Sequence, residues 1–118
     1  MAKDSIQPLK PAHFFILVAL ANQDRYGSSI QREVMRLMDG HLKLWPTLLY
    51  STLESLLEEG WIEELSDPGE LPPGTSRRRR YYRITPRGRQ VLAGEAERLS
   101  GLAETARQRV ADGQEKPI

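Results

Sequence analysis

The sequence of 118 residues contains no cysteine and only two histidines, His13 and His41. The lack of cysteine excludes disulfides and thiolate metal sites, and it is typical of a reducing compartment. The two histidines lie on different predicted elements, so neither a histidine metal site nor a histidine-based catalytic pair is expected. No nucleophile–base pair or phosphate-binding glycine loop is visible either. We therefore expect no enzyme, no metal and no cofactor.

Long hydrophobic runs are also missing. The longest, AHFFILVALA (Ala12 to Ala21), is about half of the roughly 20 residues that a membrane-spanning helix needs. It is not followed by a signal-peptide cleavage pattern. The composition, 39% hydrophobic and 28% charged, is that of a globular domain. We expect a buried helix in a cytoplasmic protein that has no membrane partner.

A large net charge is absent, because 17 Lys and Arg face 16 Asp and Glu for a net charge of +1. The charges are nevertheless segregated along the chain. Seven arginines and no acidic residue fall between Thr75 and Gln90, whereas seven carboxylates and no basic residue fall between Glu54 and Glu70. A solvated loop usually mixes both signs, so the arginine-rich segment favours contact with nucleic acid over mere solubility. The acidic segment is better explained as a solvent face than as a partner-binding patch.

Three helices are predicted before the arginine-rich segment. The first begins at Pro11, and the second covers GSSIQREVMRLMDG, where Ser28 and Gln31 have the spacing of a capping box and Gly40 is a terminator. The third begins at Pro46 and ends at Gly60. Its leucines follow the periodicity of a core-facing side: Leu49, Leu53, Leu56 and Leu57.

Two strands are predicted, WIEEL and RRYYRIT, joined by a long loop rich in proline and glycine. In the second strand, Tyr82 and Ile84 share one face and should pack on the domain. Arg79, Tyr81 and Arg83 share the other face and should point outward. The order of helix, helix, helix, strand, long loop and strand is that of a winged helix-turn-helix, a mainly α fold with a small two-stranded β-hairpin.

A final helix is predicted to begin at Pro86 with Thr85 as its cap, and its apolar residues have a spacing close to a heptad seam. Such a long, glycine-diluted helix needs a partner, as does the first helix, which is apolar on nearly all sides. We therefore expect a homodimer, with residues 8–85 as the DNA-binding domain and residues 86–112 as the dimerisation helix. The predicted dimer interface comprises Phe14, Phe15, Val18, Leu92, Leu99, Leu102, Ala103, Ala106 and Val110.

In a winged helix-turn-helix the third helix enters the major groove of DNA and the wing grips the backbone or minor groove. Glu54 and Glu58 would repel phosphates, so contact should be confined to the N-terminal half of the third helix. The predicted DNA contacts are Lys43, Thr47, Tyr50, Ser51, Arg77, Arg78, Arg79, Arg80, Tyr81 and Arg83. Trp61 is expected in the core. Trp45 is expected to pack between the domain and a helix, with contact to an effector as the alternative.

Four ordered blocks resemble the PadR family of transcriptional regulators: AHFFILVALA, RYGSSI, LLYSTLESLLEEGWI and RRRYYRITPRGR. The resemblance covers nearly the whole chain. It implies a homodimeric bacterial regulator, usually a repressor, that binds an operator in double-stranded DNA. It also implies that a small apolar or aromatic effector can bind between the subunits. The competing hypothesis is a winged-helix protein–protein interaction module without specific DNA binding.

Overall fold

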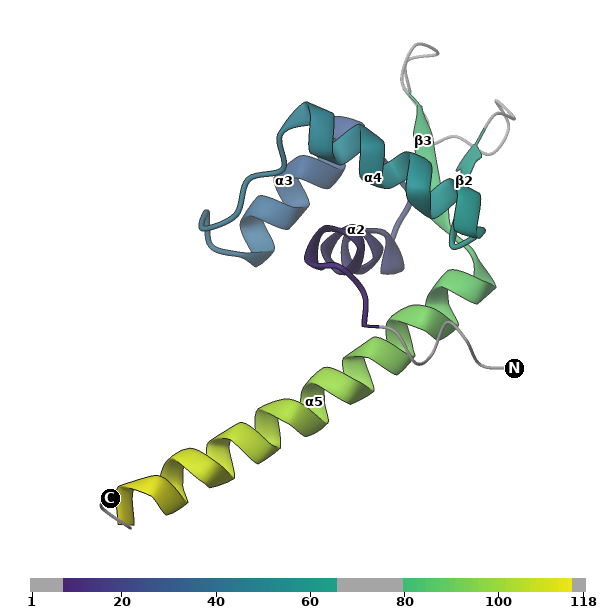
Figure 1. Ribbon diagram of the computed structural model, residues 1–118. Helices are drawn as coiled ribbons and strands as arrows, with labels where there is room; N and C mark the ends of the chain where they lie inside the picture. The colour runs from purple at the N-terminus through teal and green to yellow at the C-terminus, as the bar shows by residue number, and fades with distance from the viewer. Residues whose placement is uncertain (1–7, 66–79, 116–118) are drawn as a thin grey trace.

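The computed structural model describes residues 8–65 and 80–115. Figure 1 shows three helices clustered together, strands beside them, and a last helix that extends away as a long rod. The described elements are, in chain order, α2 (Pro11–Ala21), β1 (Arg25–Tyr26), α3 (Gly27–Leu37), α4 (Pro46–Glu59), β2 (Ile62–Leu65), β3 (Tyr81–Ile84) and α5 (Pro86–Glu115). The predicted mainly α fold is confirmed, although the sheet has three strands and not two.

Helix α2 lies at the centre of the fold, in contact with α3, α4, α5 and β3. Residues such as Ile16 and Leu17 are completely buried. Elements of the same protomer therefore cover most of α2, which corrects the expectation that one chain offers too few faces to bury it. Of its large apolar side chains, only Phe14, Phe15 and Val18 stay partly exposed.

Helix α4 packs on this centre with the predicted face. Leu49, Leu53 and Leu56 are buried, as the leucine spacing predicts, and Thr52 is buried beside them. The helix ends at Gly60, whose φ of 78° lies in the left-handed region that glycine adopts without strain. Trp61 follows directly and is buried, so its assignment to the core is confirmed.

The sheet is antiparallel, with the strand order β1-β3-β2. The predicted hairpin of β2 and β3 is confirmed, with Ile62 opposite Ile84. The third strand, β1, pairs Tyr26 with Tyr81 on the other edge of β3. A strand of two residues carries no alternation that sequence analysis could detect.

The start of α3 differs from the capping box predicted for Ser28 and Gln31. The helix begins at Gly27, and its N-cap position, Tyr26, has no side-chain capping hydrogen bond. The side-chain amide of Gln31 instead donates a hydrogen bond of 2.6 Å to the carbonyl oxygen of Leu44. Gln31 therefore ties α3 to the segment that leads into α4, which is a tertiary role that local spacing cannot reveal.

The predicted cap of α5 is confirmed. The hydroxyl of Thr85 accepts a hydrogen bond of 3.0 Å from the amide of Gly88 and donates one of 2.7 Å to the carbonyl oxygen of Gly60. Gly88 is buried, and a Cβ built on it would lie 2.0 Å from the carbonyl oxygen of Trp61. The first turn of α5 can approach the end of α4 this closely only because residue 88 has no side chain.

Candidate nucleic-acid interface

The first half of α4 presents neutral polar side chains to solvent. Thr47, Tyr50 and Ser51 are all exposed, on the side of the helix opposite the buried leucines. The structure thus brings together three of the residues predicted to contact DNA. Glu54 and Glu58, also exposed, follow on later turns. The exposed side of α4 is therefore neutral in its N-terminal half and acidic in its C-terminal half.

Tyr50 packs against Gly27 at the start of α3, where the lack of a side chain leaves room for the tyrosine ring. A Cβ added to Gly27 would lie 2.7 Å from the hydroxyl oxygen of Tyr50. The Tyr50 side chain is nonetheless 51% exposed, so its ring lies against the start of α3 while one side faces solvent. This packing fixes the direction of Tyr50 before any ligand binds, which reduces the entropy lost on binding.

An exposed aromatic residue precedes α4. Trp45 occupies the N-cap position of the helix and is 62% exposed, so the expected packing between the domain and a helix is not formed within one protomer. The ammonium group of Lys43 lies 4.6 Å from the centre of its indole ring, which is cation–π geometry. Lys43 and Trp45 therefore form a cationic and apolar pair at the end of α4 that carries Thr47.

Part of the predicted wing surface lies outside the described residues, namely Arg77, Arg78 and Arg79. Arg80 is described, and its side chain is 72% exposed with Nε 3.8 Å from a carboxylate oxygen of Glu64. Burial raises the pKa of the Tyr82 hydroxyl, and the Glu64 carboxylate raises it further, against the hydrogen bond with Arg80. Tyr82 thus stays protonated in a buried position, as predicted for the inner face of β3.

Tyr81 and Arg83 do not lie free on the outer face of β3, as the alternation of the strand predicts. Tyr81 is only 7% exposed, and its ring packs edge to face on Tyr26 at a centroid distance of 5.2 Å. Arg83 donates two hydrogen bonds, of 2.9 and 3.2 Å, to the carboxylate of Asp24. Both corrections have one cause: the unpredicted strand β1 and the residue before it cover this face.

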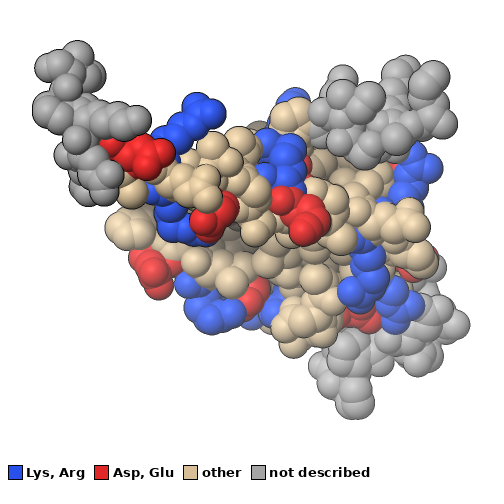
Figure 2. Space-filling model, turned by 90° about the horizontal axis from the view of Figure 1, so that it is seen from below, with Lys and Arg blue, Asp and Glu red and all other residues tan. Residues whose placement is uncertain are grey.

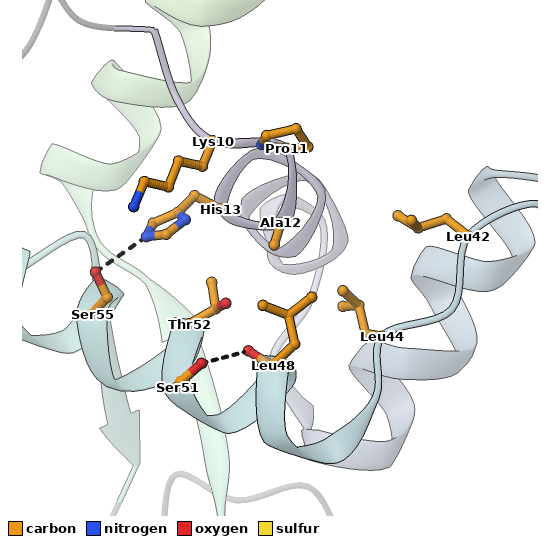
Figure 3. Close-up of a pocket in the computed structure, with 10 residues that line it drawn as sticks. All are labelled: Lys10, Pro11, Ala12, His13, Leu42, Leu44, Leu48, Ser51, Thr52 and Ser55. Carbon is orange, nitrogen blue, oxygen red and sulfur yellow. Dashed lines mark hydrogen bonds between the residues drawn. The ribbon is translucent and has the colours of Figure 1, made fainter.

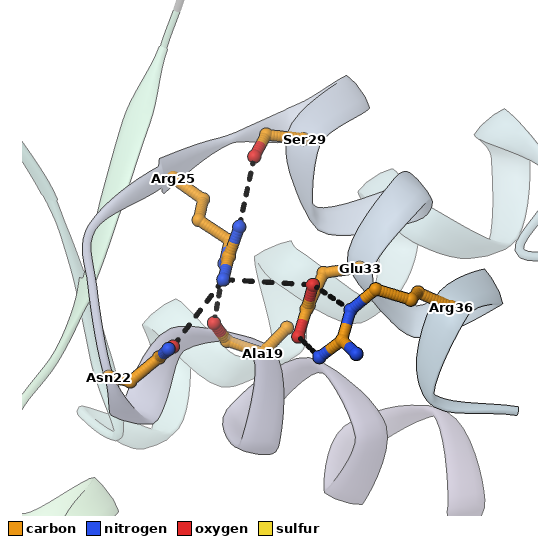
Figure 4. A network of polar contacts seen from close by, with 6 residues as sticks. All are labelled: Ala19, Asn22, Arg25, Ser29, Glu33 and Arg36. Atoms are coloured by element: carbon orange, nitrogen blue, oxygen red, sulfur yellow. Dashed lines mark hydrogen bonds and ion pairs between the residues drawn. The ribbon is translucent and has the colours of Figure 1, made fainter.

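A polar network holds β1 and α3 against the end of α2 (Figure 4). The guanidinium of Arg25 donates a hydrogen bond of 2.7 Å to the carbonyl oxygen of Ala19 and reaches Asn22 and Ser29 at 3.4 Å. It also lies 3.8 Å from Glu33. This arginine therefore satisfies a carbonyl in the last turn of α2, where helix carbonyls lack intrahelical partners.

Glu33 belongs to the same network through a second arginine. Arg36 donates hydrogen bonds of 2.7 and 3.0 Å to its carboxylate. These bonds, helped by the charges of Arg36 and Arg25, lower the pKa of Glu33 against the effect of burial. The sequence gives no sign of this network, because its members are ordinary surface residue types.

Another face of the molecule carries charges of both signs. Figure 2, seen from below the view of Figure 1, shows basic and acidic side chains next to one another on the same face. Within α5, Arg98 and Arg107 form ion pairs with Glu95 and Glu104 at 2.6 and 2.8 Å. A surface of mixed charge does not attract a polyanion.

Other classes of site are not supported by the described part of the chain. In residues 8–65 and 80–115, no three His, Asp or Glu side chains come together as metal ligands. Within the same ranges, no helix is long and apolar enough to cross a lipid bilayer.

Solved structures of similar fold cover nearly the whole chain. A transcriptional regulator from Clostridium thermocellum, Cth-833, is 26% identical, with a TM-score of 0.69 over 92% of this chain and 96% of its own. A PadR family transcription regulator from Clostridium difficile R20291 is 18% identical, with a TM-score of 0.69 over 86% of this chain and 99% of its own. BpsR of Bordetella bronchiseptica, whose DNA binding is regulated by 6-hydroxynicotinic acid, is 20% identical, with a TM-score of 0.57 over 86% and 64%.

At the level of sequence, no curated protein matches the chain. The family model described as "Transcriptional regulator PadR-like family" matches residues 16–94, which include all elements from α3 to β3. This match extends from within α2 to the first turns of α5, and it agrees with the exposed polar face of α4. The chain therefore belongs to the PadR-like family of transcriptional regulators, which bind DNA and are not enzymes.

Proposed function

We propose that the protein represses transcription by binding a near-palindromic operator as a homodimer, with the N-terminal half of α4 in the major groove. The observation that carries this proposal is the exposed, neutral and polar side of α4 at Thr47, Tyr50 and Ser51. Such side chains can hydrogen-bond to base edges or phosphates without electrostatic repulsion. The acidic later turns restrict contact to this half of the helix.

The pair formed by Lys43 and Trp45 extends the proposed contact surface beyond the start of α4. Lys43 supplies a cation for a phosphate, and the exposed indole of Trp45 offers a flat apolar surface to sugars or base edges. The arginines of the wing, including the exposed Arg80, supply further phosphate contacts. Tyr81 and Arg83 are not part of the proposed surface, because each is engaged within the protomer.

The proposed dimer is supported by the surface of α5. From Ala96 to Gly113, every residue of the helix is exposed in the protomer. Three large apolar side chains in this stretch, Leu99, Leu102 and Val110, are 36%, 54% and 63% exposed. A long helix with an apolar side and no covering element is expected to pair with a second copy. The two copies of α4 should then read half-sites about one helical turn, roughly 34–36 Å, apart.

A small apolar or aromatic effector that releases the DNA is the last part of the proposal. It is supported by the structurally similar BpsR, whose DNA binding is regulated by 6-hydroxynicotinic acid. A gel-shift titration of the DNA that flanks the protein's own gene tests the function as a whole. The alternative, a protein–protein interaction module, predicts no retarded band with any DNA at moderate salt.

The affinity for operator DNA should fall steeply with salt if the wing arginines contact phosphates. If each wing neutralises about three phosphates, log K against log salt should have a slope of about −5 for the dimer. Replacing Arg77, Arg78 and Arg79 together with alanine should flatten this slope by several units and weaken binding to all DNA sequences. Fluorescence anisotropy of labelled operator, measured between 50 and 200 mM salt as in the usual range of such titrations, gives both quantities.

The matched control removes three cations that do not belong to the wing, by the changes Arg107→Ala and Arg109→Ala in α5 and Lys116→Ala near the end of the sequence. This control alters the net charge by the same amount as the wing variant. Because its wing arginines are intact, its slope of log K against log salt should stay close to that of the unmodified protein. If the slope flattened by the same amount in the two triple variants, the net charge of the protein, and not the wing, would attract the DNA.

The fluorescence of Trp45 should report on DNA binding. Trp45 is 62% exposed whereas Trp61 is 7% exposed, so the variant Trp61→Phe isolates the signal of an exposed indole and Trp45→Phe that of a buried one. Operator DNA should shift and quench the emission of the Trp61→Phe variant, because contact removes water from the indole. The Trp45→Phe variant serves as the control and should respond little. If the emission changed only in the Trp45→Phe variant, whose signal comes from Trp61, Trp45 would be excluded from the interface.

A further inference from the structure

A hydrogen bond from α3 holds the backbone just before α4. The side-chain amide of Gln31, in the second turn of α3, donates this bond to the carbonyl oxygen of Leu44 at a distance of 2.6 Å. The acceptor lies between the end of α3 at Leu37 and the start of α4 at Pro46. Gln31 is partly buried, and a hydrogen bond that is shielded from water is stronger than an exposed one. We call this bond the Gln31 tether.

Leu44 is fixed by its side chain as well. That side chain is 2% exposed, and it lies beside Leu42 and Leu48, with Ala12 of α2 facing them (Figure 3). These residues line a pocket of about 480 Å³ between the start of α2 and α4. Leu44 is thus held at two points, since the apolar interior holds its side chain and Gln31 holds its carbonyl group. Its peptide group cannot turn without breaking one of the two contacts.

The position of Leu44 determines where its two neighbours point. Its carbonyl group and the N–H of Trp45 belong to one planar peptide unit, so the Gln31 tether also orients the backbone of Trp45. Trp45 has extended backbone angles, φ −68° and ψ 149°, and successive side chains of an extended chain point to opposite sides. With Leu44 turned inward, Lys43 and Trp45 are turned outward, and both are exposed.

The two outward side chains form one unit at the start of α4. The ammonium group of Lys43 lies 4.6 Å from the centre of the Trp45 indole ring. The carbonyl oxygen of Trp45 accepts a hydrogen bond of 2.8 Å from the amide of Leu49, in the first turn of α4. The same short backbone segment therefore fixes the cation–π pair and the beginning of the helix that carries Thr47.

We propose that Gln31 is a positioning residue for DNA recognition, because its tether to Leu44 sets the direction in which Lys43 and Trp45 meet the DNA. Gln31 acts through these two residues, since its side-chain amide is directed at the protein backbone. Recognition requires contacting groups to be placed to within roughly 0.5 Å, and side chains that are held before binding lose less entropy. The role in recognition rests on the proposed function, whereas the Gln31 tether is a property of the free protein.

A positioning role differs from structural support in what its loss changes. If Gln31 only stabilised the fold, removing its hydrogen bond would weaken binding to every DNA sequence to the same extent. If Gln31 positions Lys43 and Trp45, the loss falls on the operator, where the indole and the ammonium group have defined partners. Non-specific DNA is bound mainly through charge and should be affected little.

The Gln31 tether is tested first without DNA, in the Trp61→Phe background, where Trp45 supplies the only indole fluorescence. Gln31→Met preserves the length of the side chain and cannot donate a hydrogen bond. Gln31→Glu preserves the length too, but its carboxylate only accepts hydrogen bonds and repels the Leu44 carbonyl oxygen. Time-resolved anisotropy should show a larger fast component of Trp45 motion in Gln31→Met, and a still larger one in Gln31→Glu. Both variants should stay folded by circular dichroism, since one net hydrogen bond is a small part of the stability.

The role in recognition is measured by titrating operator DNA and a scrambled duplex of equal length at one salt concentration. Gln31→Met should bind the operator about fivefold more weakly, which corresponds to the net contribution of one hydrogen bond. Its affinity for the scrambled duplex should stay within about twofold of that of the unmodified protein. Gln90→Met is the matched control, because it makes the same change at an exposed glutamine of α5. It should leave Trp45 motion and both affinities unchanged.

Each part of the proposal has its own contradicting result. Unchanged Trp45 motion in both Gln31 variants would show that the Gln31 tether does not hold the pair, which overturns the proposal. An equal loss of affinity for the operator and the scrambled duplex would overturn the positioning role and leave Gln31 with structural support alone. If the unmodified protein bound no DNA, the proposed function would fail together with the role of Gln31 in recognition, while Trp45 motion would still decide the tether.

Discussion

Replacing Gly88 with alanine should lower the free energy of unfolding by about 3 kcal/mol, at the upper end of what overpacking usually costs. The new Cβ would lie 2.0 Å from the carbonyl oxygen of Trp61 and 2.9 Å from a side-chain carbon of Ile84. The carbonyl belongs to backbone and cannot rotate away as a flexible side chain could. The first turn of α5 must therefore move away from the end of α4. Urea unfolding followed by circular dichroism measures the loss.

Gly94→Ala is the matched control for this prediction, because Gly94 lies in the same helix with no described atom within 4 Å of an added Cβ. Alanine there should stabilise the protein by up to about 1 kcal/mol through its higher helix propensity. The two substitutions are chemically identical and should have opposite signs. If both variants were stabilised, the close contact of Gly88 with Trp61 would have to be wrong.

Replacing Leu99 with aspartate should dissociate the proposed dimer at micromolar concentration. Leu99 lies near the centre of the apolar side of α5, and a dimer would bury two unpaired carboxylates there, one from each copy. The dissociation constant should rise by at least about 100-fold, since burying an unpaired polar group costs roughly 2 kcal/mol or more and each copy contributes one. Sedimentation equilibrium measures the constant, and operator affinity should fall in parallel.

Gln108→Asp is the control for the dimer, because residue 108 points to the opposite side of α5 at about 100° per residue. It adds the same charge to an exposed position and should leave the dissociation constant nearly unchanged. A Leu99→Asp protein that remains a dimer would exclude this side of α5 as the interface.

Sequence patterns are sufficient to predict a feature that depends on a single helix and the residues next to it. The leucines of α4, from Leu49 to Leu56, define its buried face and thereby its exposed face, so Thr47 and Ser51 could be placed correctly. Thr85 could be identified as a cap because a cap depends on residues within one turn. The elements that sequence reasoning identified are those whose signal is local.

The errors arise where distant segments meet. β1 exists because Arg25 and Tyr26 pair with β3, more than fifty residues away, and no local pattern marks a two-residue strand. The burial of Tyr81 and the ion pair of Arg83 follow from that pairing. A pocket between α2 and α4 also could not be predicted, since the residues that line it, Lys10 and Leu48 among them, come together only through tertiary packing.

The junction at Thr85 gives α5 the geometry of a lever. A single residue separates Ile84, the end of β3, from Pro86, the start of α5, and two hydrogen bonds fasten that residue to Gly60 and Gly88. The 30 residues of α5 correspond to a rod about 45 Å long. A rotation of about 10° at Thr85 therefore moves the far end by about 8 Å. In a dimer joined along these rods, small changes in their crossing angle set the distance between the two wings.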